Sequence, residues 1–153
     1  MLSRTVVVGL VLLLLLPPAS YAGITSITKN GDLGFGRFVS FASSGTVTVN
    51  TVGARSAAGG VTLLNGGTVA AASYRVTGSK NSSYTISLPA NNTVAISSGG
   101  HTLTLTNFTC SVPLTGKLGA NITTMTFTVG ATITVAPNAT PGNYSGTFNI
   151  SAN

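Results

Sequence analysis

Hydrophobic and polar residues alternate over long stretches of this chain, most clearly in residues 124–150. From Met125 to Val135 the odd positions are apolar or small, whereas the even positions are threonine or glycine. A repeat of two residues is typical of a β-strand with one buried and one solvated face. After a turn-rich segment at residues 137–143, the alternation resumes on even positions, from Tyr144 to Ile150. Residues 124–150 therefore predict strands of a sheet with a buried and a wet face.

Shorter alternating segments fill the rest of the chain, and glycine, asparagine, serine or proline separates them. In residues 33–41 the apolar residues Leu33, Phe35, Val39 and Phe41 fall on odd positions, with Arg37 interrupting. Gly34 and Gly36 predict a bulge or a close backbone approach. Residues 53–60 are predicted as a loop. Residues 69–77 and 84–88 carry a hairpin signal. The phase shifts after Asn107, which predicts a bulge near Asn107 or Phe108.

This pattern predicts eight to ten strands and contains no helical period. The expected fold class is all-β, an immunoglobulin-like Greek-key β-sandwich formed by residues 23–153 as one domain. The predicted inner residues are Phe35, Val47, Val49, Tyr74, Val76, Ile86, Leu88, Leu103, Leu105, Phe127, Val129, Ile133, Phe148 and Ile150.

The first 22 residues have the pattern of a cleavable signal peptide. Arg4 precedes an apolar run at residues 6–16, and small residues flank Tyr21 before Gly23. Cleavage is expected between Ala22 and Gly23, and an uncleaved anchor is the alternative. The apolar run is shorter than the roughly 20 residues that a spanning helix needs. We therefore expect an exported chain with no transmembrane segment in its mature part.

The composition leaves few residues for catalysis. Only 5 % of the residues are charged, and the chain has one acid, Asp32, one histidine, His101, and one cysteine, Cys110. Asp32 follows a turn and His101 follows two glycines, so we interpret both as loop residues. These residues match no metal-ligand spacing. The sequence thus predicts no enzyme activity, no catalytic, metal or cofactor-binding residue and no cofactor.

Removing Arg4 leaves six basic residues and one acid, a formal charge of +5. The basic residues are scattered and not interleaved with aromatic residues, so we expect no nucleic-acid partner. An exported chain with one cysteine forms no internal disulfide. For Cys110 we favour a small buried side chain, with an intermolecular disulfide as the alternative.

Several motifs together resemble a family of exported bacterial domains of unknown function that is related to chaperone–usher pilins and other fimbrial subunits. The resemblance rests on residues 32–36 (DLGFG), 45–49 (GTVTV), 55–57 (RSA), 59–63 (GGVTL), 74–78 (YRVTG), 84–89 (YTISLP), 130–135 (GATITV) and 141–148 (PGNYSGTF). It implies an immunoglobulin-like sandwich that assembles into a filament by donating a strand to its neighbour. A periplasmic chaperone and an outer-membrane usher would then be partners, and the final location would be extracellular or on the cell surface.

Two non-enzymatic functions are consistent with these observations. In the first, the chain is a structural subunit of a surface filament, and Ile24 and Ile27 of one subunit enter a groove of the next. The segment at residues 23–29 could instead extend its own sheet. In the second, a self-complete, adhesin-like sandwich binds a glycan or an envelope polymer through loops around Arg55, Lys80, His101 and Lys117.

Overall fold

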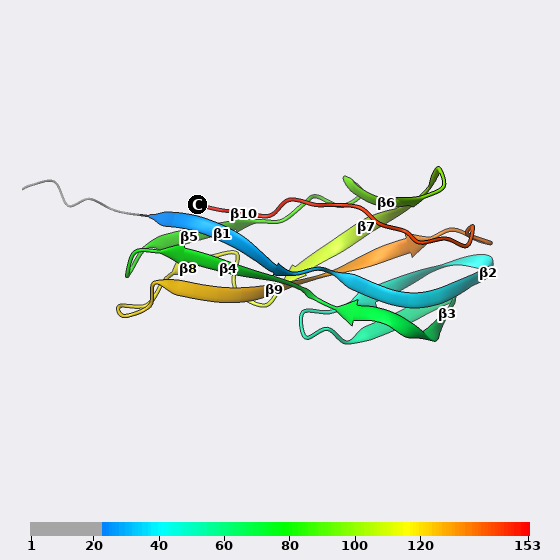
Figure 1. Ribbon diagram of the computed structural model, residues 1–153, viewed down its shortest axis with the longest axis horizontal. Helices are drawn as coiled ribbons and strands as arrows, with labels where there is room; N and C mark the ends of the chain where they lie inside the picture. Colours follow the sequence, from blue (N-terminus) through cyan, green and yellow to red (C-terminus); the bar gives the residue numbers. More distant parts are fainter. Residues whose placement is uncertain (1–22) are drawn as a thin grey trace, which may run out of the picture.

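The computed structural model describes residues 23–153, which fold into antiparallel β-strands (Figure 1). The signal peptide expected at residues 1–22, including Ala22 of its cleavage site, lies outside these residues. The strands are β1 Ile24–Gly31, β2 Gly34–Val49, β3 Arg55–Ala70, β4 Ala72–Gly78, β5 Ser83–Ser87, β6 Val94–Ser98, β7 His101–Cys110, β8 Thr115–Lys117, β9 Thr124–Val135 and β10 Ser151–Ala152. No helix that could cross a membrane occurs in residues 23–153.

The strands form two sheets, so the expected all-β sandwich is confirmed. The larger sheet has the order β1-β4-β9-β2-β3, and β7 also pairs with β9 and carries β6 on its other side. The smaller sheet has the order β10-β5-β8. Strand β9 is central because its first half pairs with β4 while its second half lies between β2 and β7.

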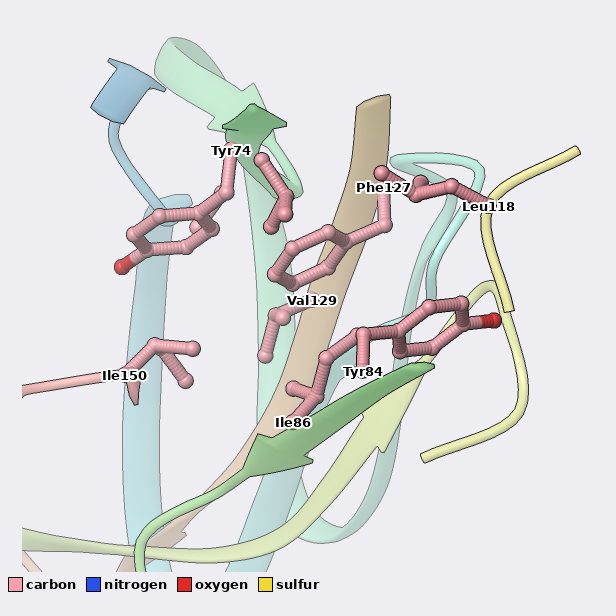
Figure 2. Packing of buried hydrophobic residues seen from close by; sticks show 9 residues of the cluster. Tyr74, Tyr84, Ile86, Leu118, Phe127, Val129 and Ile150 are labelled. Carbon is pink, nitrogen blue, oxygen red and sulfur yellow. The ribbon is translucent and has the colours of Figure 1, made fainter. Parts of the chain in front are cut away.

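The core divides into two clusters along the length of β9. The first core cluster lies between β4 and β9 on one side and β5 on the other, where Tyr74 stacks on Phe127 with ring centroids 5.5 Å apart (Figure 2). Its buried members are Ala72, Tyr74, Val76, Tyr84, Ile86, Leu118, Phe127, Val129 and Ile150. The buried members of the second core cluster are Val47, Val61, Leu103, Leu105, Ala131, Ile133 and Val135.

Alternation predicted most of these positions correctly. All of the predicted inner residues are buried except Phe35, Leu88 and Phe148, which are only partly buried. Phe148 still contacts Phe108, with ring centroids 5.5 Å apart. Strand β9 spans the first part of residues 124–150, as expected. The strand expected at residues 144–150 is reduced to one bridge, between Ser145 and Ser97, before the short β10.

The hairpin predicted from residues 69–77 and 84–88 is wrong. Strand β4 pairs with β1 and β9, whereas β5 pairs with β8 and β10 in the other sheet. Tyr74 and Ile86 therefore belong to the same core cluster but lie on strands of different sheets. Two alternating segments joined by a polar turn have the same pattern in a hairpin and in a connection between sheets, so the sequence does not distinguish them.

The bulge predicted near Asn107 is confirmed, because the β7–β9 register shifts between Thr106 and Thr109 and Asn107 has a φ of +50°. A second bulge lies at Gly36, where Phe35 pairs with Val69 but Arg37 pairs with Leu64. After this bulge, over residues 37–41, the even positions of β2 face the core and the odd positions face outward.

Phe38 consequently packs on the second core cluster, while Val39 and Phe41 are exposed by 38 % and 55 %. The shared face predicted for all odd positions of residues 33–41 is therefore wrong beyond Gly36. Residues 53–60, predicted as a loop, instead begin β3 at Arg55. They lack alternation because they form an exposed edge of the larger sheet.

The β2–β3 hairpin folds back on itself, and Arg55 holds its two halves together. The inner half pairs residues 45–49 with 55–59, and the outer half pairs residues 34–40 with 61–70. The Arg55 guanidinium donates hydrogen bonds of 2.9 Å to the backbone carbonyls of Phe35, Arg37 and Leu64 in the outer half. Nine residues of straight strand would separate Arg55 from Leu64 by about 30 Å, so these bonds require the fold-back.

Replacing Arg55 by Met should destabilise the domain by about 2–3 kcal/mol, because charged hydrogen bonds of this kind are strong and three carbonyls lose their donor. The free energy of unfolding, measured by urea denaturation, tests this. Arg75→Met is the matched control, because Arg75 is an exposed residue of β4. An equal loss of stability in both variants would contradict the role of Arg55 in holding the two halves of the hairpin together.

Candidate functional site

An open groove of about 1010 Å³ runs beside the outer half of the hairpin and is the candidate site. Its floor is apolar and is formed by Ala72, Tyr74, Val94, Ile96, Leu103 and Leu105. One wall is formed by residues 33–40 at the start of β2, and the opposite wall by residues 139–148 of the C-terminal segment. In Figure 1 this segment runs from the end of β9 past β6 towards β10.

The groove exists because each wall is paired on one side only. The outer half of β2 pairs with β3 and has no second strand partner among the described residues. The C-terminal wall pairs with β6 through Ser145, which exchanges two backbone hydrogen bonds of 2.9 and 3.1 Å with Ser97. Both walls therefore present main-chain groups across an apolar floor.

The far end of the groove is closed by hydrogen bonds that fix the two walls to each other. The amide of Asn138 donates to the Phe41 carbonyl at 2.8 Å, and the amide of Ala139 donates to Ser40 Oγ at 2.8 Å. The wall of residues 34–40 would span about 23 Å as an extended strand. The space thus has the length and the chemistry to hold one extended segment with apolar side chains on one face.

The structure places Ile24 and Ile27, the predicted donor residues, on the protein's own sheet. They lie in β1, which pairs with β4 from Ile24 opposite Gly78 to Gly31 opposite Ser73. Both side chains are partly buried against the first core cluster. Gly23, the residue after the expected cleavage site, precedes β1 and is exposed. Of the two possibilities for this segment, the chain described here adopts the pairing with its own sheet.

The sparse candidates for catalysis lie apart from the groove floor. Asp32 is 82 % exposed at the rim and accepts a 2.5 Å hydrogen bond from Lys29 Nζ. His101 is exposed at the turn between β6 and β7. In residues 23–153 no three histidine, cysteine, aspartate or glutamate side chains gather in a way that could hold a metal ion.

Of the four positions proposed for glycan recognition, only Lys80 lies in a loop, whereas Arg55 begins β3, His101 begins β7 and Lys117 ends β8. The Arg55 guanidinium is occupied by backbone carbonyls within the hairpin. Lys80 and Lys117 lie on adjacent segments, since the amide of Asn81 donates to the Gly119 carbonyl at 3.3 Å.

Cys110 is a free thiol, partly buried beside the first core cluster.

Two ionisable groups beside the groove have shifted pKa values. Burial raises the pKa of Tyr74, because the apolar floor disfavours its phenolate. The hydrogen bond from Lys29 to Asp32, and the charge of that carboxylate, raise the pKa of Lys29 at the exposed rim. The folded protein therefore holds the protons of both groups more tightly than the unfolded chain does.

The stability of the protein should consequently fall as the pH rises above about 10. A raised folded-state pKa gives stabilisation that is present below the unfolded pKa and is lost as the pH passes the folded one. Tyr74→Phe should lose less stability than the wild type between pH 9 and about 11.5 in urea denaturation. Tyr144→Phe is the control, because the Tyr144 hydroxyl bonds only to the exposed Thr140 carbonyl. If wild type and Tyr74→Phe lost equal stability at alkaline pH, this contribution of Tyr74 would be excluded.

The sequence predicted residues of the groove floor but not the groove itself. The alternation of residues 101–107 indicated that Leu103 and Leu105 face inward, yet a local pattern does not show what covers them. The one available signal was the turn-rich segment at residues 137–143, which separates the two stretches of alternation and contributes to one wall of the groove.

Comparison with known proteins gives one match. No curated protein and no solved structure matches the chain. A family model described as Domain of unknown function (DUF4402) matches residues 25–153, which is nearly all of the described part. The chain belongs to this DUF4402 family of domains of unknown function.

Proposed function

We propose that this protein is an exported structural subunit of a bacterial surface filament, and that subunits join by β-strand addition. The observation that carries the proposal is the apolar groove flanked by two main-chain walls, each paired on one side only. A strand added there would form hydrogen bonds on both sides, while alternate side chains would cover Leu103 and Leu105. The expected signal peptide supports export, and the resemblance of the sequence motifs to a family related to fimbrial subunits supports a location on the cell surface.

The segment that we propose as donor is β1 of a second subunit, with Ile24 and Ile27 as the residues that enter the groove. The eight residues of β1 would extend about 26 Å, close to the length of the wall formed by residues 34–40. In its own subunit β1 pairs on one side, with β4. Transfer to a neighbour would replace this one-sided pairing by two-sided pairing and would cover the apolar floor. The gain in main-chain pairing and in buried apolar area favours assembly.

An exposed groove of this kind also explains why a subunit would need partners before assembly. Unpaired strand edges beside an apolar floor promote aggregation. A periplasmic chaperone that occupies the groove would prevent this, and an outer-membrane usher would exchange it for the donor strand of the next subunit.

A charge on the groove floor tests the proposal directly. Ile96→Lys should abolish filaments and the heat-labile ladder of oligomers on denaturing gels, because a lysine at this partly buried position obstructs the donor. Ile122→Lys is the matched control, because Ile122 is 50 % exposed and lies outside the groove. Electron microscopy of the exported protein and unheated gels provide the measurement.

The result that would overturn the proposal is equally clear. Exported wild-type protein that remains monomeric, without filaments or a ladder, would exclude a self-assembling subunit. Normal filaments from a folded Ile96→Lys variant would exclude the groove as the acceptor. Circular dichroism melts of both variants establish that the domains compared are folded.

A further inference from the structure

The larger sheet ends in a strand edge that is unusually open to pairing. In the inner half of the hairpin, residues 55–59 of β3 pair with β2 without a register shift, and no strand of residues 23–153 pairs with their other side. Ser56, Ala57, Ala58 and Gly59 are all exposed. Gly59 has a φ of +71°, so the regular part of this edge is residues 55–58. A regular edge with free N–H and C=O groups is a template for another strand.

None of the usual devices that protect an edge is present in this segment. It contains no proline, and its only charged residue, Arg55, turns its guanidinium inward to three backbone carbonyls. The two register shifts in β2–β3 pairing lie outside residues 45–49 and 55–59: one between the Phe35 and Arg37 pairs, the other between the Ser40 and Gly45 pairs. Charges, prolines and bulges are the features by which natural proteins prevent pairing at an edge, so the inner half remains available.

We infer that two copies of this chain pair through the inner half of β3, antiparallel and about a two-fold axis at Ala57. A second copy fits this edge because a two-fold axis places Ala57 opposite itself and Ser56 opposite Ala58, which brings only small side chains together. The same symmetry brings no like charges together, although the protein carries a net positive charge. The larger sheets of the two copies would then form one continuous sheet.

This contact is separate from the groove. It uses the inner half of β3, whereas the groove is bordered by the outer half of the hairpin and the C-terminal segment. Two-fold pairing closes after two copies, while strand donation is head-to-tail and continues without limit. The dimer therefore goes beyond the proposed function and would link two filaments, or two subunits, side by side.

The first test is the mass of residues 23–153 carrying Ile96→Lys, which blocks assembly through the groove, measured by sedimentation equilibrium up to high micromolar concentration. We expect a dimer that a further Ala57→Lys substitution converts to a monomer with little change in melting temperature, because an edge lysine blocks pairing. Ala120→Lys in the same background is the matched control at an exposed turn and should leave the dimer intact. A monomer of the Ile96→Lys protein, or a dimer that persists after Ala57→Lys is added, would overturn the inference.

A disulfide cross-link tests the register of the pairing between the two copies. In a Cys110→Ala background, Ala57→Cys should form a disulfide-linked dimer in air, because opposed residues of an antiparallel pair have Cα atoms about 4.5–5.5 Å apart, a separation that a disulfide spans. Ala120→Cys should remain unlinked. No cross-linking at position 57, or equal cross-linking at both positions, contradicts the two-fold pairing. Ile96→Lys distinguishes the two proposals, because it should stop filaments and leave the cross-link at position 57 unchanged.

Discussion

Replacing Phe127 by Ala is expected to lower the free energy of unfolding by about 3–5 kcal/mol. The Phe127 side chain is only 1 % exposed, on the central strand β9, and its ring stacks on Tyr74 at an interplanar angle of 18°. The substitution removes a large apolar side chain from between two strands that cannot close the space, because β9 is held by partners on both edges. Typical domains are stable by about 5–15 kcal/mol, so the variant should lose a large share of its stability.

Urea denaturation of residues 23–153 measures this loss, and Phe41→Ala is the control. Phe41 is 55 % exposed, so its truncation should change the free energy of unfolding by less than about 1 kcal/mol. Equal losses in the two variants would show that the first core cluster does not carry the stability assigned to it. Figure 2 shows how closely the Tyr74 and Phe127 rings lie within that cluster.

The contrast between Phe127 and Phe41 shows what the sequence could predict about this fold. Phe127 lies in an unbroken alternation of apolar residues and threonines, which identifies both its strand and its inward face. Phe41 follows Gly36, whose φ of +65° interrupts the extended backbone, and beyond it the side chains of residues 38–41 lie on the opposite faces from those that alternation predicts. The glycine indicated that a bulge was possible, but only the pairing of β2 with β3 shows where the register shifts.

Alternation along the sequence could not predict the features that depend on long-range packing. The Arg55 clamp joins residues 20 positions apart in the chain, and an isolated basic residue in a polar segment resembles any solvated loop residue. The groove depends on which strand edges remain unpaired after folding, a property of the whole sheet. The predicted donor residues Ile24 and Ile27 were identified as apolar, but only the register of β1 shows that they lie on their own β4.

Mixing two complementary variants is expected to give one-to-one dimers and no filaments. The first variant, Ile96→Lys, has a blocked groove and an intact β1. The second, Ile24→Ser with Ile27→Ser, has an intact groove and a donor without its apolar side chains. Neither should assemble by itself, because head-to-tail growth needs a donor and an acceptor on the same subunit. In the mixture, β1 of the first variant enters the groove of the second, and growth stops after that one contact.

The dimer should be visible on unheated denaturing gels and should disappear on heating. The pairing inferred at Ala57 would add a second contact, so the experiment is performed with Ala57→Lys in both variants. Mass spectrometry of isotopically labelled subunits then shows whether each dimer contains one copy of each variant. Dimers of a single variant, or filaments from the mixture, would mean that β1 is not the donor or that the groove is not the acceptor. A mixed dimer would show that the monomer holds β1 on β4 only until a neighbour offers two-sided pairing.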